Sequence, residues 1–383
     1  MGIKDKRIFW LTAGYFLDVD LPVVPLLKKR FDINWMILTS AGNLADDERY
    51  IRSKTDCSFE ILADTGSFYS LEHYRLLRDI IKRISKEQYA LYYFDISDFL
   101  FLFPLINRYL PKERVVIATH NVSVPKGARL ALLAKCTMRY VLSHFKNFQV
   151  FSSNQRDVIL RRRPDADILY APLMLKDYGH PAQPVTRDRK EVRFLFFGNI
   201  VRYKRLDILI EAVDILRKKG IEDFKIYICG YCQKSVWDKE YAPKITDSSR
   251  YHLDIRRIPN DEVARYFAEC DYFVMPYQDI AQSGAMTVAL NYNMPIIASD
   301  LPTFHEFITG AGDSMFFRTG DAPDLAMKME EAIRLSEEDY KLMKSKLKRI
   351  VDEKLSERAI ISKYESYISR LLNSEEEMGL CQS

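Results

Sequence analysis

The sequence contains few of the residues that mark fibrous, disordered or disulfide-stabilised proteins. Its 383 residues include 14 glycines, 15 prolines and 6 cysteines. Sparse glycine and proline, without an internal repeat, argue against a collagen-like or low-complexity chain. Six scattered cysteines do not make a disulfide framework. Only Cys229 and Cys232 are spaced as a motif. Without a second close pair, they are expected to be reduced thiols at a strand end rather than a zinc or redox site.

Long hydrophobic runs are also lacking. No stretch of about 18 uncharged apolar residues occurs, so the sequence predicts no membrane-spanning helix. The first residues are charged and lead directly into a strand-like stretch, unlike a secretory signal peptide. We therefore expect a cytoplasmic protein. Hydrophobic residues make up 48% of the chain and charged residues 29%, a balance that suits two folded domains at this length.

Positive charge is concentrated in one segment, although the net charge is only +4. Between residues 126 and 163 the only acid is Asp157, against Lys126, Arg129, Lys135, Arg139, Lys146, Arg156, Arg161, Arg162 and Arg163. Much of this segment has a helical pattern, which favours either peripheral docking on an anionic membrane or an ordinary solvated helix. No aromatic-interleaved basic motif is present, so nucleic acid is not an expected partner.

Short apolar runs alternate with helical patterns, as is typical of parallel α/β proteins. In the first half, strands are predicted over 7–12, 34–39, 90–94, 114–119, 149–152 and 168–171, with helices over 21–30, 71–85 and 154–162. In the second half, strands are predicted over 192–197, 224–228, 272–275 and 296–298, with helices over 206–219, 261–268, 284–292, 322–336 and 338–372.

This alternation predicts two doubly wound, Rossmann-like α/β domains facing across a cleft. We expect an N-terminal domain over 1–180, a linker over 181–191 and a C-terminal domain over 192–355. Residues 356–383 are expected to form a helix that packs back on the first domain, followed by a disordered tail. In such sheets, ligands bind at the carboxyl ends of strands, so functional residues should follow strands directly.

Two segments of the second half follow this rule. Phe197-Gly-Asn-Ile-Val-Arg-Tyr-Lys204 joins a predicted strand to a helix, and Arg202 with Lys204 could hold a diphosphate. Met275-Pro-Tyr-Gln-Asp-Ile-Ala-Gln-Ser-Gly284 also follows a strand, and its end opens a helix whose free amides could bind phosphate. Each segment alone could be an ordinary loop, the first a basic surface loop and the second capped by Ser283. Together they indicate one shared anionic ligand.

These segments resemble family 4 glycosyltransferases, which are retaining group 1 glycosyl transferases with the GT-B fold. The resemblance covers most of residues 192–325 and extends more weakly over the first half. It is carried by FLFFGNIVRYKRLDILIEAVDIL, IPNDEVARYFAECDYFVMPY, QSGAMTVALNYNMPIIASD and FRTGDAPDLAMKMEEAI. It implies a metal-independent, hexosyltransferase-type transfer from a nucleotide sugar, such as a UDP- or GDP-sugar, without another cofactor.

The resemblance also implies roles for individual residues of the second half. Lys204 matches the lysine that binds the diphosphate, and Arg202 is expected to assist it. Ser283 and Gly284 match the loop whose amides contact the donor phosphates, and Ile258 matches the position that meets the nucleobase. The remaining donor-binding residues are expected to be Gly198, Asn199, Tyr277, Gln282 and Glu306.

In the first half, Ala118-Thr-His-Asn-Val122 resembles the family's strand-end histidine. His120 is expected to polarise or hydrogen-bond the transferred sugar, and Gly14, Asp18 and Asn121 are expected on the acceptor side. Asp18-Val-Asp20 superficially resembles a metal-binding Asp-x-Asp, but we interpret it as an acceptor-side or structural segment.

The sequence departs from the family at its pair of glutamates and at Asn199, which stands where the family often has an arginine. The family's pair of glutamates falls on Ile280 and Val288, so both carboxylates are absent. Two alternatives therefore stand beside a glycosyltransferase that extends a glycan or lipid-linked acceptor in surface polysaccharide synthesis. One is a GT-B sugar-nucleotide epimerase, which the missing carboxylates disfavour. The other is a non-catalytic sugar-nucleotide-binding subunit, which they favour.

Overall fold

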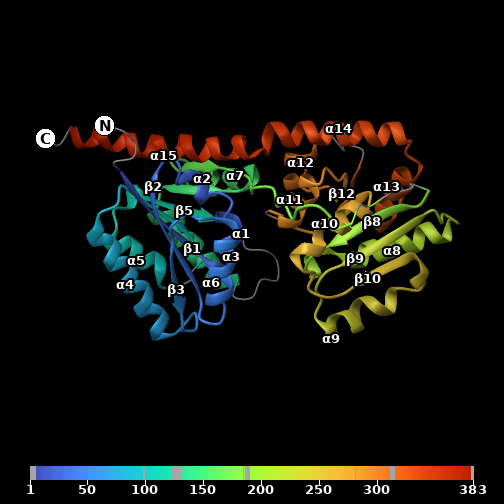
Figure 1. Cartoon of the computed structure of the whole chain (residues 1–383), viewed down its shortest axis with the longest axis horizontal. Helices are drawn as coiled ribbons and strands as arrows, with labels where there is room; N and C mark the ends of the chain where they lie inside the picture. Colours follow the sequence, from blue (N-terminus) through green and yellow to red (C-terminus); the bar gives the residue numbers. More distant parts are fainter. Residues whose placement is uncertain are drawn as a thin grey trace. The chain divides into compact units, whose positions relative to one another are not determined.

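The structure is a computed structural model that describes residues 6–97, 100–122, 131–183, 185, 190–280, 282–310 and 315–380. The chain divides into two compact units (Figure 1). The first comprises Met1–Met174 and Glu357–Ser383, and the second comprises Leu175–Ser356.

Among the described residues, the first unit contains one parallel sheet of seven strands. Its order is β3 (Glu60–Asp64), β2 (Asp32–Ser40), β1 (Arg7–Ala13), β4 (Leu91–Asp95), β5 (Val115–Thr119), β6 (Asn147–Val150) and β7 (Asp167–Tyr170). The chain reverses direction across the sheet between β1 and β4. In a doubly wound sheet this switch point is where ligands bind, just beyond the carboxyl ends of the strands.

Helices cover both faces of this sheet because its strands are apolar on both sides. Along β1, Phe9 and Leu11 pack in one cluster with α4 (Leu71–Glu87) and α5 (Leu102–Tyr109). Ile8 and Trp10 pack in another cluster, which includes side chains of α1, α2, α3 and α15. The remaining elements of the unit are η2 (Gly14–Phe16), α1 (Leu17–Asp20), α2 (Val24–Leu27), α3 (Leu44–Lys54), η3 (Lys112–Arg114), α6 (Ala131–His144), α7 (Ser153–Arg162) and α15 (Glu357–Leu380).

The helix α15 belongs to the first unit although it ends the described chain. Its buried side chains Ile360, Tyr364 and Ile368 pack beside β1 residues, and Arg370 makes a two-pronged ion pair with Asp167 at 2.6 and 2.7 Å. The spacing of these apolar residues by four places them on one helical stripe. α15 thus buries an apolar stripe and completes one face of the first sheet.

The second unit repeats the architecture with six described strands, all parallel. Their order is β10 (Tyr251–Asp254), β9 (Phe224–Cys229), β8 (Val192–Phe197), β11 (Tyr272–Met275), β12 (Ile296–Ser299) and β13 (Phe316–Phe317). Its switch point lies between β8 and β11. The helical elements are η4 (Arg202–Lys204), α8 (Leu206–Lys218), α9 (Lys234–Val236), η5 (Trp237–Tyr241), η6 (Ala242–Lys244), η7 (Ser248–Arg250), α10 (Asn260–Glu269), α11 (Gly284–Asn291), α12 (Pro302–Ile308), α13 (Ala322–Arg334) and α14 (Glu337–Lys354).

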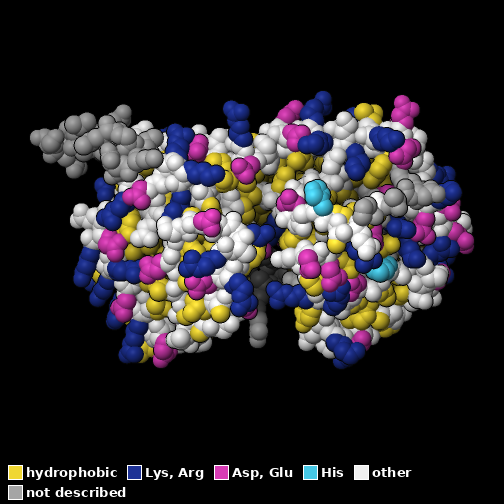
Figure 2. All heavy atoms as spheres, in the orientation of Figure 1, with side chains coloured by type: hydrophobic (Ala, Val, Ile, Leu, Met, Phe, Trp, Pro, Cys, Tyr) yellow, Lys and Arg dark blue, Asp and Glu magenta, His cyan; other side chains and the backbone are white. Residues whose placement is uncertain are grey.

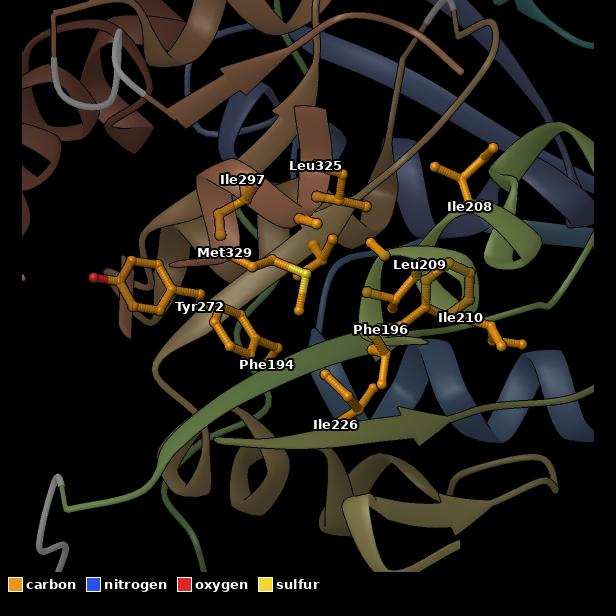
Figure 3. Close-up of a cluster of buried hydrophobic side chains, with 14 of the residues drawn as sticks. Phe194, Phe196, Ile208, Leu209, Ile210, Ile226, Tyr272, Ile297, Leu325 and Met329 are labelled. Carbon is orange, nitrogen blue, oxygen red and sulfur yellow. The ribbon is translucent and has the colours of Figure 1, made fainter. Parts of the chain in front are cut away.

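The core of the second unit explains why its helices form where the sequence predicts them. Figure 3 shows Phe194 and Phe196 of β8 packed against Leu209 of α8 and Met329 of α13. α8 buries seven of its thirteen residues, which recur with helical spacing. Burying each large aliphatic or aromatic side chain contributes about 1.5–3 kcal/mol, so this face holds η4 and the start of α8 in place.

The structure departs from the sequence prediction near residue 21. Within the predicted helix over 21–30 only α2 is helical, and a turn separates it from α1, which ends at Asp20. Pro25 stands in the first turn of α2, where its missing N–H is tolerated, whereas within a continuous helix it would break a backbone hydrogen bond. The break allows α1 to end at the buried Asp20.

Among the described residues, no helix combines the length and apolarity needed to cross a bilayer. Lys and Arg side chains are interspersed with Asp and Glu over the face of each unit drawn in Figure 2.

Candidate functional site

In the second unit, the predicted phosphate-binding segment leaves the sheet at the end of β8. Gly198 has φ +97°, and its N–H donates to the carbonyl of Cys229 at 2.9 Å. The next strand end packs directly against it, since a Cβ on Gly230 would lie 2.0 Å from the Gly198 carbonyl oxygen. Two glycines at adjacent strand ends therefore bring the backbones into contact and leave room beside them for Lys204.

Lys204 ends η4 and is 7% exposed. Its Nζ would stand 3.2 Å from a Cβ on Gly198, and lies 5.4 Å from the ring centre of Tyr277. Burial lowers the pKa of Lys204 from 10.5 to about 8. Among the described residues, no hydrogen bond or ion pair of Nζ is formed. A buried, unpaired ammonium is costly, and a bound anion would compensate it.

The second predicted segment meets the first through its backbone. The N–H of Gln278 donates to the carbonyl of Tyr203 at 2.8 Å, which ties the loop after β11 to η4. Tyr277 is fully buried between Lys204 and Ser283. Its burial raises the pKa of Tyr277, and the neighbouring Ser283 hydroxyl acts in the opposite direction.

Ser283 caps α11, with its hydroxyl accepting from the N–H of Met286 at 3.2 Å. The first amides of the helix point toward its N-terminal end, where an anion is favoured. Lys176 also reaches this end, because its Nζ and Cε lie 3.8 Å from where a Gly284 Cβ would stand. A buried ammonium, a helix N-terminus and a second lysine thus belong to one connected set of loops.

The other residues that are predicted to bind the sugar donor differ in their exposure to solvent. Arg202 is 84% exposed and pairs with Glu240 at 2.6 Å. Asn199 is exposed, and Gln282 and Glu306 are half-buried. Ile258 packs partly against a second cluster of buried side chains in this unit, which includes Leu195 and Val288. Thus the structure brings Lys204, Tyr277, Ser283 and Gly284 together, whereas the Arg202 guanidinium points to Glu240.

The loop that carries Ile258 is braced by charge. The Arg256 guanidinium donates two hydrogen bonds to the Asp254 carboxylate, at 2.8 and 3.0 Å, and also pairs with Glu262. Tyr266 donates from α10 to the same Asp254 carboxylate. The side chains of Arg256 and Glu262 are both open to solvent, so their ion pair contributes little stability, but these contacts restrict the loop that is predicted to meet the nucleobase.

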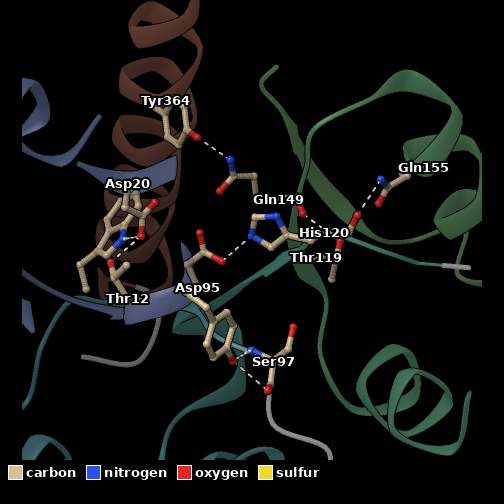
Figure 4. Close-up of polar contacts among 11 residues, drawn as sticks. Thr12, Asp20, Asp95, Ser97, Thr119, His120, Gln149, Gln155 and Tyr364 are labelled. Carbon is tan, nitrogen blue, oxygen red and sulfur yellow. Dashed lines mark hydrogen bonds and ion pairs between the residues drawn. The ribbon is translucent and has the colours of Figure 1, made fainter. Parts of the chain in front are cut away.

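In the first unit, His120 directly follows β5 and is 5% exposed. Its Nε2 lies 2.7 Å from Asp95 Oδ1 (Figure 4). The imidazole is stacked between Phe16, with ring centres 3.6 Å apart, and Phe151, at 4.4 Å. Gln155 donates to the His120 carbonyl at 3.0 Å. The ring is therefore fixed in orientation on both faces and along one edge.

A cavity of about 290 Å³ opens beyond β1, β2, β3 and β4 of the first unit. Its wall includes Gly14, Thr39, Asp47, Asp64 and His73. His73 Nδ1 lies 2.5 Å from Asp64 Oδ2, and Thr39 donates to Asp47. The lining contains two carboxylates, Tyr15 and Phe68, with no lysine or arginine among its described residues. Such a cavity suits hydroxyl groups and the apolar face of a ring better than it suits an anion.

The remaining acceptor-side candidates differ in exposure. Gly14 lines the cavity, Asn121 is exposed, and Asp18 is exposed and accepts from Tyr50 at 3.2 Å. Asp20 is instead buried, so the two carboxylates of Asp18-Val-Asp20 do not share one environment. Within the described ranges, no group of three His, Cys, Asp or Glu side chains is placed to hold a metal ion.

The basic segment is divided by the fold. Lys126 and Arg129 lie outside the described residues. Lys135 and Arg139 are exposed on α6, whereas Arg161 and Arg162 end α7, and the buried strand β6 lies between the two helices in the chain. Arg163 turns inward and donates to the carbonyl of Leu142 at 2.5 Å. Leu132 on α6 is 76% exposed, so that helix presents an apolar side chain beside its cations.

Comparison with known proteins places the second unit in a family. Residues 191–334 match the family model described as glycosyl transferases group 1. The second unit therefore carries a group 1 glycosyl transferase domain. This domain holds Lys204, Tyr277, Ser283 and Gly284, the residues whose contacts are described above.

The whole chain shares its fold with solved GT-B glycosyltransferase structures. A glycosyltransferase from Rickettsia africae is 12% identical with a TM-score of 0.75, over 96% of this chain and 98% of its own. Sucrose-phosphate synthase from Thermosynechococcus elongatus is 12% identical with a TM-score of 0.73, over 96% and 100%. HepE from Anabaena, solved with UDP and glucose, is 13% identical with a TM-score of 0.71, over 95% and 100%. No sequence among curated proteins matches significantly.

Several residues around these sites were not predicted from the sequence. Asp64 and Asp95 each end a strand, so the strand-end rule alone could have found them. Lys176 has no such signal, because it precedes the sheet of its unit and approaches Gly284 only through the path of the chain.

Proposed function

We propose that this protein is a glycosyltransferase that takes a nucleoside diphosphate sugar, such as a UDP- or GDP-sugar, as donor. The observation that carries the proposal is the buried Lys204 ammonium, which forms no ion pair with the described residues and belongs to the same connected loops as the N-terminus of α11. A diphosphate supplies the negative charge that this arrangement lacks. Such electrostatic stabilisation is often the largest single contribution to catalysis.

Solved neighbours support this class of donor. HepE was solved with UDP-glucose, and TarM from S. aureus was solved with UDP and α-GlcNAc-glycerol. Because these proteins share the fold at low identity, they support the donor class without fixing the sugar or the base. We carry over only a nucleoside diphosphate sugar as the donor and a hydroxyl group as the acceptor.

The transfer we propose is retaining and metal-independent. The acceptor oxygen forms a bond to the anomeric carbon while the bond from that carbon to the donor phosphate breaks, on the same face of the sugar. The proton of the acceptor hydroxyl passes to the leaving phosphate oxygen. Lys204 and the first amides of α11 would stabilise the charge that develops there, with Lys176 as a further cation. Arg202 remains a proposed contributor that would have to leave Glu240.

The cavity of the first unit is the part that we assign to the acceptor. Its volume of about 290 Å³ is at the lower end of the range for small-molecule sites, which is about 300–1,000 Å³. Asp47 and Asp64 can accept hydrogen bonds from hydroxyl groups, and Phe68 offers a ring surface. We propose that it receives the sugar portion of a glycan or lipid-linked acceptor in surface polysaccharide synthesis, in the cytoplasm.

Peripheral membrane association would fit a lipid-linked acceptor. The exposed Leu132, Lys135 and Arg139 of α6 combine an apolar side chain with cations, as helices that lie on anionic lipid do.

A non-catalytic sugar-nucleotide-binding subunit is the second candidate, and one observation favours it. Val288 is 3% exposed within α11, and Ile280 packs against the same core cluster. Apolar side chains thus occupy the two positions that carry glutamates in the resembling family, and both pack with the apolar core. A binding subunit would hold the donor as tightly as the enzyme but would release no sugar.

Calorimetric titration with UDP, GDP, ADP and dTDP tests the donor assignment. We expect one nucleotide to bind, its nucleoside to bind far more weakly, and Lys204→Ala to reduce the affinity for the diphosphate but not for the nucleoside. A charged hydrogen bond is worth about 1.5–3 kcal/mol, or roughly 10- to 150-fold in Kd. Equal affinities of the wild type and the variant for the diphosphate would contradict the assignment. Lys218→Ala, at the exposed end of α8, is the control.

A further inference from the structure

Beside His120, the first unit buries two carboxyl groups that come from different elements. Asp20 ends α1 and Asp95 ends β4, and both are buried. The groups that act on Asp20 are Asp95, Thr12 and Trp10, none of which is a cation. Two neighbouring carboxylates without a cation between them do not both stay ionised near neutral pH, because burial and mutual repulsion oppose the second charge.

The hydrogen bonds indicate which carboxyl group holds the proton. Asp20 Oδ2 already accepts from Trp10 Nε1 at 2.8 Å and from Thr12 Oγ1 at 2.5 Å. Trp35 donates to Thr12 Oγ1 at 2.9 Å, so the Thr12 hydroxyl proton is directed toward Asp20. A proton on Asp20 must therefore be on Oδ1.

Asp95 needs the donor that a protonated Asp20 provides. Its Oδ1 faces His120 Nε2, while its Oδ2 is buried and meets no donor among the described residues. A buried acceptor without a donor destabilises the fold. Thr12 is the register partner of Asp95 on the neighbouring strand and contacts Asp20, which places the two carboxyl groups side by side. The negative charge is also better placed on Asp95, because the imidazole N–H touches that carboxylate and not Asp20.

We propose that Asp20 is protonated at neutral pH and donates to the Asp95 carboxylate, which accepts from His120 Nε2–H and so holds the neutral imidazole in the tautomer whose Nδ1 is an acceptor. Asp20 and Asp95 are positioning residues that act through His120. Burial, followed by the charge of Asp95, raises the pKa of Asp20 well above its usual range. Figure 4 shows both carboxyl groups on the same side of the imidazole.

The surroundings isolate this proton from solvent. The Tyr93 ring stacks on Trp10 with centres 3.6 Å apart, and Tyr364 of α15 accepts from Gln149. Burial is the largest cause that raises the pKa of both tyrosines, so they remain neutral.

The consequence for catalysis rests on the proposed function. In this tautomer Nδ1 can accept a hydrogen bond from a hydroxyl group, whereas an Nδ1–H would donate to an oxygen. The network thus selects between the two roles that a histidine at this strand end could have, and assigns the accepting one.

Nitrogen-15 NMR of the full chain, labelled only at histidine, tests the tautomer without any substrate. The His120 signals are identified by their loss in His120→Gln. Near neutral pH we expect Nε2 at the shift of a protonated nitrogen and Nδ1 at the shift of an unprotonated one. The reverse pattern, or two protonated nitrogens, overturns the proposal.

Two substitutions test the position of the proton. In Asp20→Asn the amide oxygen can still accept from Trp10 and Thr12, and the amide N–H can donate to Asp95. This variant should therefore keep the nitrogen-15 signals of His120 and the melting temperature of the wild type. Asp20→Ala should lower the melting temperature. In the infrared, Asp20→Asn should remove a protonated-carboxyl band that the wild type shows at neutral pH. If the wild type lacks that band, or if Asp20→Asn loses the His120 pattern, Asp20 is not the proton donor.

Asp95→Asn separates positioning from transfer. The amide of this variant has one oxygen and one NH2 group, so it cannot accept at both of the positions that face His120 and Asp20. We therefore expect the nitrogen-15 signals of the imidazole to change. If transfer is confirmed, kcat should fall with little change in the donor KM. Should Asp95→Asn fail to fold, the wild-type and Asp20→Asn spectra still decide. Those spectra need no sugar donor, so they can refute the proposed tautomer while glycosyl transfer stands. A transfer assay can likewise refute glycosyl transfer while the proposed tautomer stands.

Discussion

Replacing Lys204 with methionine should strengthen the fold and weaken donor binding at the same time. Methionine keeps a long unbranched side chain beside Gly198 and Tyr277 but removes the buried ammonium. Burial lowers the pKa of Lys204 from 10.5 to about 8. At about 1.4 kcal/mol for each factor of ten, holding this lysine protonated at pH 7 costs the fold on the order of 3 kcal/mol.

The dependence on pH follows from the direction of this shift. The folded protein binds the lysine proton more weakly than the unfolded chain does, so the cost is fully present below pH 8. It declines as the pH rises from about 8 to 10.5, where the unfolded lysine also loses its proton. The stability advantage of Lys204→Met over the wild type should therefore be largest near pH 7 and should shrink above pH 8.

Donor binding by the wild type should weaken as the pH rises above 8. A diphosphate binds the protonated lysine, so the Kd of the wild type should be constant below pH 8 and should rise above it. In Lys204→Met, the affinity should be roughly 10- to 150-fold lower near pH 7, and the rise above pH 8 should be smaller. Urea unfolding measures the stability and calorimetry measures the Kd, with Lys218→Met as the matched control on α8.

Two results would contradict the role assigned to Lys204. If Lys204→Met is destabilised by several kcal/mol at pH 7, the ammonium must have a compensating partner in the folded protein. If the variant binds the nucleotide as tightly as the wild type at every pH, the lysine does not contact the phosphates. A variant that is more stable but binds less well would instead show a residue kept for function at the expense of stability.

Three other predictions concern the fold, metal dependence and the basic segment. Gly230→Ala should lower the free energy of unfolding by more than about 2 kcal/mol in urea titrations, because φ is +148° and the new Cβ would lie 2.0 Å from the Gly198 carbonyl oxygen. Excess chelator should leave transfer unchanged in a donor-turnover assay, and strict dependence on Mg²⁺ or Mn²⁺ would contradict the proposed metal-independent mechanism. In sedimentation with vesicles, binding should require anionic lipid, weaken steeply with salt and decrease in Arg161→Glu/Arg162→Glu; no binding at low salt would remove the membrane part of the proposal.

Much of the fold could be predicted because the local sequence pattern of most elements agrees with the way those elements pack in the fold. The predicted strand over 192–197 and the helix over 206–219 match β8 and α8 closely, since apolar periodicity and strand-end glycine point to the same boundaries. The helix predicted over 21–30 is wrong, because Pro25 begins a new short helix rather than continuing one. Periodicity also gave no prediction for α3, whose exposed, charged sequence buries only Ile51.

The candidate site was predicted less completely. Spacing after a strand indicated Lys204 and Ser283, but it could not show that one ammonium is buried and that Arg202 turns to Glu240. Burial depends on residues far along the chain, here Tyr277, which no local pattern relates to Lys204. The same is true of Asp95, which lies 25 residues from His120 in sequence and 2.7 Å from it in the fold.

Detection of the released nucleotide and the transferred sugar would show directly whether this protein transfers a sugar. The purified full chain would be incubated with UDP-, GDP-, ADP- and dTDP-sugars, with glycan or lipid-linked acceptors and without them. We expect that one donor is consumed, that an acceptor accelerates its consumption, and that the product keeps the donor's anomeric configuration. Lys204→Ala should abolish turnover. Tight binding of a nucleotide sugar without nucleotide release under any of these conditions would contradict glycosyl transfer and identify the protein as a binding subunit.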